Sequence, residues 1–147
     1  MSPVLLVDDN PDDVLLMRRA FNATSISAPL VVMSGGEAAI EYLSGSGPYA
    51  DRSVHPLPLL MLLDLKMPRV SGFDILRWLR EQPALKRLPV IMLTSSIQDE
   101  DINKAYDLGV NSYIVKPSGL KEIAEVAAQV DSYWLKLNQR PVLTDGG

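Results

Sequence analysis

Cysteine is absent from this chain of 147 residues, and histidine occurs once, as His55. The lack of cysteine excludes disulfide bonds, thiolate metal sites and cysteine nucleophiles. His55 lies in a segment rich in glycine and proline, residues 45–58, which predicts an irregular loop. We therefore interpret His55 as an exposed loop residue.

Long apolar runs and clusters of basic residues are also lacking. No run reaches the roughly 18 residues that a membrane span needs, and the N-terminus has neither the basic stretch nor the apolar core of a signal peptide. Lys and Arg are dispersed and the net charge is −4, which argues against nucleic acid as the main partner. We expect a cytoplasmic protein with no membrane or nucleic-acid partner.

Short apolar runs alternate with longer segments of helical period, which predicts an α/β domain with a parallel sheet and helices on its faces. The expected strands are residues 3–7, 30–33, 59–63, 90–93 and 112–115. The helices that follow them are expected to begin near Asn10, Ser34, Ser71, Asp99 and Ser118. Asn10 and Ser118 are predicted caps, and Ser34 with Glu37 has the spacing of a capping box. Asp12 and Asp13 are interpreted as acids that complement the dipole of the first helix.

Polar side chains follow four of the five predicted strands. They are Asp8 and Asp9 after the first strand, Asp64 after the third, Thr94 and Ser95 after the fourth and Lys116 after the fifth. Ligands of open parallel sheets bind at the carboxyl ends of the strands, so we expect these groups to converge on one point.

Carboxylates, a hydroxyl and an amine in one place indicate a divalent cation and a transferable phosphoryl group. Asp8, Asp9 and Asp64 would repel one another unless a cation neutralised them, and an all-oxygen set favours Mg²⁺ over zinc. An aspartate can attack phosphorus, and Asp64 is the best candidate because it ends the most apolar strand. Thr94 and Lys116 would neutralise the phosphoryl oxygens.

These segments resemble the receiver domain of two-component response regulators. The resemblance rests on residues 7–10 (Val-Asp-Asp-Asn), 63–68 (Leu-Asp-Leu-Lys-Met-Pro) with Gly72, 93–95 (Leu-Thr-Ser) and 113–117 (Tyr-Ile-Val-Lys-Pro). It implies a flavodoxin-like, doubly wound five-stranded parallel sheet in the order 2-1-3-4-5, with helices on both faces. The receiver domain would span residues 1–138, followed by a tail at 139–147 and no output domain.

The resemblance also implies the roles of the acidic residues. Asp64 would be the phosphoacceptor, forming 4-aspartylphosphate with a phosphoryl group from a histidine kinase. Mg²⁺ would be bound by Asp9, Asp64 and the backbone carbonyl of Lys66, with Asp8 acting through water. The protein would not be an enzyme beyond assisting its own phosphoryl transfer and dephosphorylation.

The resemblance also implies two switch residues, Thr94 and Tyr113. Tyr113 would turn inward when Thr94 moves. Thr94 and Lys116 would both contact the phosphoryl group. The Lys116–Pro117 bond would be cis, an isomer that only proline makes accessible, at roughly 0.5–1 kcal/mol.

A narrower resemblance, to stand-alone receivers paired with bacterial phytochromes, rests on residues 10–13, residues 42–43 with the insertion 47–58, residues 108–113 and residues 133–134. It implies a phytochrome kinase as partner and output through protein contacts. Apolar residues in the last helix and tail further predict a homodimer. They are Tyr133, Trp134, Leu137, Val142 and Leu143.

Lys66 departs from many receivers, which often have a small polar or amide residue two positions after the acceptor. A cation there could pair with the phosphoryl oxygens or a nearby acid and hinder the hydrolytic water. We predict that Lys66→Asn changes the half-life of the phosphorylated protein, which is measured as the loss of phosphoprotein over time. An unchanged half-life would contradict this.

Other functions remain open at this stage. The protein could be a phosphate sink that drains another receiver, or an interaction module that takes no phosphate. A phosphatase of the haloacid-dehalogenase type carries a second acid where Lys66 stands, which argues against it. A flavin-binding electron carrier is disfavoured because Asp8 and Asp9 would repel the flavin phosphate.

Overall fold

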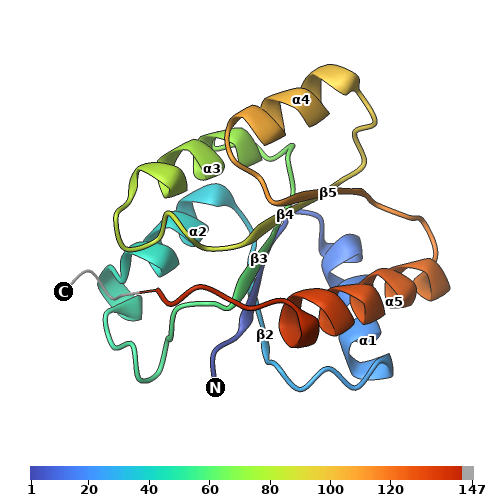
Figure 1. The fold of residues 1–147 in the computed structure, drawn as a ribbon, viewed down its shortest axis with the longest axis horizontal. Coiled ribbons are helices and arrows are strands. Elements are labelled where there is room, and N and C mark those ends of the chain that lie inside the picture. The colour runs from blue at the N-terminus through green and yellow to red at the C-terminus, as the bar shows by residue number, and fades with distance from the viewer. Residues whose placement is uncertain (144–147) are drawn as a thin grey trace.

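The computed structural model describes residues 1–143 as five strands that alternate with helices (Figure 1). All five predicted strands and the helix after each of them are present. The elements are β1 (Val4–Val7), α1 (Pro11–Ala23), β2 (Leu30–Met33), α2 (Gly36–Ser44), the 3-10 helix η1 (Gly47–Tyr49), β3 (Leu60–Leu63), α3 (Gly72–Glu81), β4 (Val90–Thr94), α4 (Asp99–Asp107), β5 (Ser112–Val115), α5 (Leu120–Gln129) and the π-helical η2 (Val130–Leu137).

The strands form one parallel sheet in the order β2-β1-β3-β4-β5, which confirms the predicted doubly wound order. The chain winds outward from β1 to β2, returns to β3 and continues to β5. Every residue of the three central strands is buried, whereas both edge strands are partly exposed. This burial explains why the central strands are continuous apolar runs rather than alternating ones.

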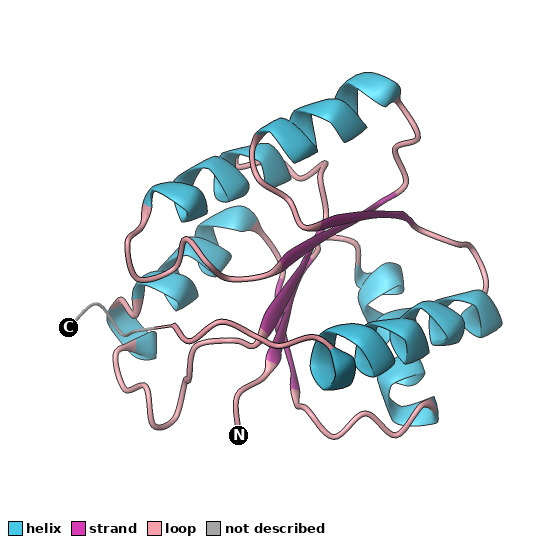
Figure 2. Cartoon of the chain, viewed as in Figure 1, coloured by secondary structure: helices cyan, strands magenta, loops and turns pink. Residues whose placement is uncertain are grey.

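Two hydrophobic cores lie on opposite faces of the sheet because successive side chains of a strand point in opposite directions. In β1, Leu5 and Val7 belong to the core under α2, α3 and α4, whereas Val4 and Leu6 belong to the core under α1 and α5. Figure 2 shows the sheet between these two helical layers. The layers leave the carboxyl ends of the strands open as the place for a site.

Helix starts test the predicted caps. The Asn10 side chain accepts hydrogen bonds from the first turn of α1, as expected. The Ser34 capping box is wrong: Gly35 caps α2 without a side chain, and Glu37 accepts a hydrogen bond from Arg69 at 2.7 Å instead. Ser118 is also wrong as a cap, because α5 begins after Gly119.

The last helix widens from α-helical to π-helical geometry at Val130. Leu137, the last residue of this π-helical segment, is 71% exposed. The Lys136 ammonium pairs with Asp131 at 2.9 Å, a spacing of five residues that suits these wider turns.

The 45–58 insertion is ordered by Arg52, whose guanidinium donates hydrogen bonds to the carbonyls of Tyr42, Leu43 and His55. The bonds to Tyr42 and Leu43 supply partners to carbonyls in the last turn of α2, which lack partners within the helix. His55 is half-buried and lies edge-on against Tyr49, with ring centres 5.1 Å apart. The prediction that His55 is exposed was therefore wrong.

Arg80 joins the α3–β4 and α4–β5 connections. Its guanidinium donates hydrogen bonds to the carbonyls of Lys86, Leu88 and Gly109 and to the Asn111 side chain, at 2.7–3.0 Å. Arg80 is half-buried, and burial lowers the pKa of its guanidinium. A side chain with five donors in a fixed fork is needed to serve these acceptors together.

Arg80→Met should therefore lower the free energy of unfolding by about 2 kcal/mol, because hydrogen bonds from a charged group are lost while the apolar stem is kept. The control is Arg77→Met on the same helix, whose exposed side chain makes one 3.5 Å ion pair with Asp74. The control should change stability by less than about 0.5 kcal/mol. Urea unfolding of both variants measures this, and equal values would contradict the role of Arg80.

The tail beyond η2 is described as far as Leu143. Leu143 is partly buried against the core that lies under α2, α3 and α4, while Val142 remains 80% exposed. The remainder of the predicted tail, residues 144–147, lies outside the described residues. None of the helices in residues 1–143 combines the length and the hydropathy required to cross a bilayer.

Candidate functional site

Three carboxylates meet at the carboxyl edge of the sheet. Asp8 and Asp9 follow β1 and Asp64 follows β3, and one oxygen from each lies within 4.8 Å of the others. Asp8 and Asp64 are buried, whereas Asp9 is exposed. Because β1 and β3 are hydrogen-bonded neighbours in register, their carboxyl ends deliver these side chains to one place. Three hard oxygen donors suit Mg²⁺ or another hard divalent cation.

Lys116 brings a cation into this acidic cluster from the end of β5. Its Nζ lies 2.8 Å from Asp8, 2.8 Å from Asp13 and 3.5 Å from Asp64. Burial of Lys116 acts to lower the pKa of its ammonium, but the hydrogen bonds to Asp13 and Asp8 and the nearby Asp64 together raise that pKa above its usual range. Lys116 therefore stays charged throughout the physiological range.

Asp64 is a destabilised carboxylate. Burial raises its pKa, and nearby Asp8 raises it further; Lys116, the Leu65 backbone N–H and the Thr94 hydroxyl act to lower it without cancelling the rise. The Leu65 N–H donates to Asp64 Oδ1 at 2.8 Å. The other oxygen, Oδ2, lies 3.5 Å from the Lys116 ammonium. A buried carboxylate with one oxygen oriented and the other beside an ammonium is suited to nucleophilic attack.

Thr94 is buried at the end of β4 and is linked to the next loop through Ser96. The Ser96 N–H lies 3.5 Å from the Thr94 hydroxyl, and the Tyr113 hydroxyl donates to the Ser96 carbonyl at 3.0 Å. The Ser96 hydroxyl donates to Asp101 in α4 at 2.6 Å. Tyr113 is half-buried, and Thr94, Tyr113 and α4 are thus joined through one residue.

One expectation about the site changes. The described residues contain no cis peptide bond, so the expectation of a cis Lys116–Pro117 bond is wrong. With the trans bond, the Lys116 N–H bonds the Thr94 carbonyl at 2.8 Å and the side chain still reaches the acids. Lys66 lies in the β3–α3 loop beside Asp64, and its side chain is exposed.

Sequence reasoning missed Asp13 and Ser96. Asp13 was interpreted as a helix-dipole acid, yet its carboxylate is one of the two nearest partners of Lys116. A signal existed, because a helix that follows β1 begins at the same edge of the sheet where β5 ends. Ser96 was overlooked because the apolar pattern of β4 ends before it.

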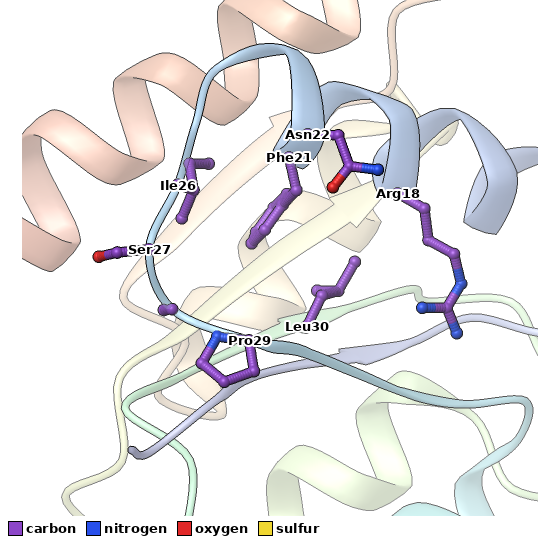
Figure 3. A pocket seen from close by; sticks show the side chains of 8 residues that line it. Arg18, Phe21, Asn22, Ile26, Ser27, Pro29 and Leu30 are labelled. Atoms are coloured by element: carbon purple, nitrogen blue, oxygen red, sulfur yellow. The ribbon is translucent and has the colours of Figure 1, made fainter.

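A separate groove of about 380 Å³ lies at the opposite end of the sheet, between the end of α1 and the start of β2 (Figure 3). Its lining residues are Arg18, Phe21, Asn22, Ile26, Ser27, Ala28, Pro29 and Leu30. Arg18 is the one charged side chain among them. The groove therefore lacks the grouped reactive side chains found at the carboxyl edge.

Asp64→Asn should raise the thermal midpoint of the metal-free protein by a few degrees. An acid whose pKa is raised on folding binds more protons folded than unfolded, so its stability cost grows as pH rises from its ordinary pKa through the raised value. The amide keeps the shape of the side chain and removes this cost at neutral pH.

Calorimetry in the presence of a chelator, across a pH series, measures the difference. The gap between the two proteins should shrink on acidification, as Asp64 itself becomes neutral. Adding Mg²⁺ should raise the midpoint of the wild-type protein more than that of the variant. A variant that is less stable than the wild-type protein at neutral pH would contradict this account.

Response regulator receivers have a parallel sheet with the strand order β2-β1-β3-β4-β5 and an acidic cluster, a threonine and a lysine at its carboxyl edge. The chain belongs to this family. The model of the response regulator receiver domain matches residues 4–128. The chain is 34% identical to response regulator Rcp1 of Synechocystis sp. over 133 residues, 90% of this chain and 88% of Rcp1.

Solved structures agree with this assignment. The phosphorylated cyanobacterial phytochrome response regulator RcpA superposes with a TM-score of 0.88 at 33% identity, covering 96% of this chain and 99% of RcpA. RPA3017, a response regulator in red light signalling of R. palustris, gives 0.89 at 35% identity, covering 95% and 99%. The Mn²⁺-bound form of Rcp1 gives 0.85 at 32% identity, covering 97% and 100%. The chain is therefore similar to phytochrome-associated response regulators.

Proposed function

We propose that Asp64 accepts a phosphoryl group from a sensor histidine kinase and that the resulting 4-aspartylphosphate switches protein contacts. The observation that carries this is the position of the Lys116 ammonium, 3.5 Å from the Asp64 carboxylate and 2.8 Å from Asp8 within one cluster of acids. A cation fixed beside a nucleophilic carboxylate can neutralise a phosphoryl group as it arrives.

In the transfer, Asp64 Oδ2 forms a bond to phosphorus as the bond from phosphorus to the donor nitrogen breaks. The electron pair stays on the departing imidazole, which takes up a proton. Lys116 neutralises one phosphoryl oxygen and the Thr94 hydroxyl donates to another. A bound Mg²⁺ supplies further neutralisation of the phosphoryl charge. Asp9, Asp64 and the Lys66 carbonyl would hold the ion, with Asp8 acting through water.

Two observations support a divalent cation here. The oxygens of three acids are grouped at the site, and the relative Rcp1 has a Mn²⁺-bound form. Asp8 shares its carboxylate with the Lys116 ammonium at 2.8 Å. That shared contact leaves Asp8 suited to a water-mediated role rather than a direct one.

The output of the switch would pass through Thr94, Tyr113 and α4. A phosphoryl group that draws in the Thr94 hydroxyl also pulls on Ser96, which is bonded to Tyr113 and to Asp101. An added charge of about −2 is enough to bias such an element between two arrangements. Tyr113 would turn inward, and the face of α4, β5 and α5 would change its preferred partner.

The kinase partner would be a bacterial phytochrome, because RcpA is a phytochrome response regulator and RPA3017 acts in red light signalling. A kinase of this type would place the protein in the cytoplasm. The dispersed basic residues and the net charge of −4 support contacts with proteins rather than with nucleic acid or membrane.

A homodimer through the end of the chain is a separate part of the proposal. Tyr133 and Leu137 are 48% and 71% exposed and lie in the same segment, η2. Leu137→Glu should lower the mass measured by sedimentation to that of the monomer. Val54→Glu is the control, since Val54 is 64% exposed elsewhere. An unchanged monomeric mass in all three proteins would remove the dimer from the account.

The phosphoacceptor role is tested by intact mass. The protein is incubated with Mg²⁺ and a small acyl phosphate, and the mass should rise by one phosphoryl group. Asp64→Asn should show no gain, whereas Asp74→Asn, a change at an exposed acid of the α3 capping box, should behave as wild type. A gain in Asp64→Asn equal to that of the wild-type protein would overturn the assignment.

A further inference from the structure

Asp13 contacts the Lys116 ammonium but does not belong to the cluster of Asp8, Asp9 and Asp64. The Lys116 ammonium has three N–H donors. Two of its acceptors, on Asp8 and Asp13, lie at 2.8 Å, within the range of a strong charged hydrogen bond. Asp64 is the third neighbour, at 3.5 Å. The cation is thus held by two carboxylates and faces the acceptor with its remaining donor.

The first turn of α1 explains how Asp13 reaches this position. Asn10 caps the helix and accepts hydrogen bonds from the N–H groups of Asp12 and Asp13, at 2.9 and 3.3 Å. Pro11 fixes the first helical residue. The rigid turn therefore carries the short Asp13 side chain to a lysine 103 positions away in the sequence.

A role in the helix dipole alone does not account for Asp13. Asp12 occupies the same turn and complements the dipole equally well. Within residues 1–143 the exposed Asp12 side chain forms no hydrogen bond or ion pair, whereas the Asp13 side chain is 33% exposed and bonds Lys116. The two neighbouring acids differ in this one contact, and Asp12 serves as a matched control.

Metal binding makes the contact more important. Asp8 belongs to the cluster that fits a divalent cation, so an ion competes with Lys116 for the Asp8 carboxylate. Asp13 is outside that cluster and remains a full partner of the ammonium. Its contact is the one that can persist when the site is loaded.

We propose that Asp13 is a positioning residue for phosphoryl transfer, which anchors the Lys116 ammonium so that its free N–H points at the phosphoryl group on Asp64. The inference rests on the proposed phosphoacceptor role. The opposite role, in which Asp13 withholds Lys116 from the acceptor, fits the geometry less well, because the ammonium is already adjacent to Asp64 while bonded to Asp13.

The test compares Asp13→Asn with Asp12→Asn, which remove the same charge from adjacent positions. Calorimetric titration with fluoroberyllate in saturating Mg²⁺ reports binding of a phosphoryl analogue, and titration with Mg²⁺ alone reports the metal. Asp13→Asn should weaken fluoroberyllate binding by about 10- to 100-fold, the scale of lost positioning partners. Mg²⁺ affinity and thermal stability should match those of Asp12→Asn.

Phosphorylation kinetics and spectroscopy separate positioning from structure. With acetyl phosphate, Asp13→Asn should lower the maximal rate with little change in half-saturation, and Asp13→Glu should recover most of the loss. In metal-free protein, the ¹⁵N ammonium signal of Lys116 should exchange with water faster in Asp13→Asn than in Asp12→Asn.

The outcomes distinguish failure of the positioning role of Asp13 from failure of the phosphoacceptor role of Asp64. Equal behaviour of Asp13→Asn and Asp12→Asn, or tighter fluoroberyllate binding by Asp13→Asn, would overturn the role of Asp13 while the wild-type protein still accepts phosphate. A wild-type protein that neither binds fluoroberyllate nor accepts a phosphoryl group would overturn the phosphoacceptor role and, with it, this inference.

Discussion

Replacing Lys116 with methionine is expected to slow phosphorylation of the protein by about 10²- to 10³-fold, the cost of removing one preorganised donor from a transition state. Methionine keeps much of the length of the side chain and removes its charge. Asp64 would then face an incoming phosphoryl group without the ammonium 3.5 Å away, and negative charge on the phosphoryl oxygens would be left uncompensated at that side.

The experiment follows intact mass over time at saturating Mg²⁺, so that loss of Lys116 is not confused with weaker metal binding. Lys121→Met, at an exposed position on α5, is the control and should phosphorylate at the wild-type rate. Lys116→Arg should recover only part of the rate, because a planar fork cannot serve three converging carboxylates as an ammonium does. A Lys116→Met rate within twofold of wild type, about 0.4 kcal/mol of barrier, would contradict this role for the lysine.

Gly72→Ala is expected to destabilise the fold by about 3 kcal/mol, through overpacking against backbone that cannot move aside. A Cβ at Gly72 would lie 2.4 Å from the Asp64 carbonyl oxygen and 2.9 Å from Leu65 Cα. The Gly72 N–H also bonds the Leu65 carbonyl at 2.8 Å, which keeps α3 pressed onto the end of β3. The packing of α3 against the loop that carries Asp64 therefore requires a residue without a Cβ at position 72.

Gly35→Ala provides the contrast. A Cβ at Gly35 meets no atom within 4 Å, and its backbone is extended, at φ −173°. Its cost should stay within about 1 kcal/mol, the scale of losing a favourable cap residue. Chemical denaturation of both variants measures the difference, and similar stabilities would contradict the close packing of α3 on β3.

Much of this fold was predictable, because buried parallel strands are short apolar runs separated by segments of helical period. The strands at Leu30–Met33 and Ser112–Val115 match their predicted bounds. The fourth strand extends one residue further than predicted, through Thr94, because Thr94 pairs with Val115 in the sheet. The apolar pattern ends at Leu93 and contains no sign of this pairing.

The failure of the predicted caps Ser34 and Ser118 could not be foreseen from local spacing, because Gly35 and Gly119 occupy the cap positions instead. Glu37 has the right position for a capping box, but Arg69, 32 positions away, takes its carboxylate. Tertiary contacts such as the one between Arg69 and Glu37 compete with local hydrogen bonds, and a short window of sequence does not reveal them. The same limit applies to the π-helical end of the last helix.

The candidate site also has features that the sequence predicted and features that it did not. The convergence of Asp8, Asp9, Asp64 and Lys116 followed from strand ends alone, since parallel strands share one carboxyl edge. Strand ends place the start of α1 at the same edge, but they do not show that Asp13, rather than the neighbouring Asp12, contacts Lys116. The sequence pattern predicts which residues lie at the carboxyl edge of the sheet, whereas the pairing of their side chains is known only from the structure.

The most direct test of the central claim is a crystal structure of the protein with Mg²⁺ and fluoroberyllate. The account predicts one ion held by Asp9, Asp64 and the Lys66 carbonyl, with the analogue on Asp64 and Lys116 and Thr94 on its fluorines. An analogue bound elsewhere, or a Lys116 side chain turned away from Asp64, would contradict it.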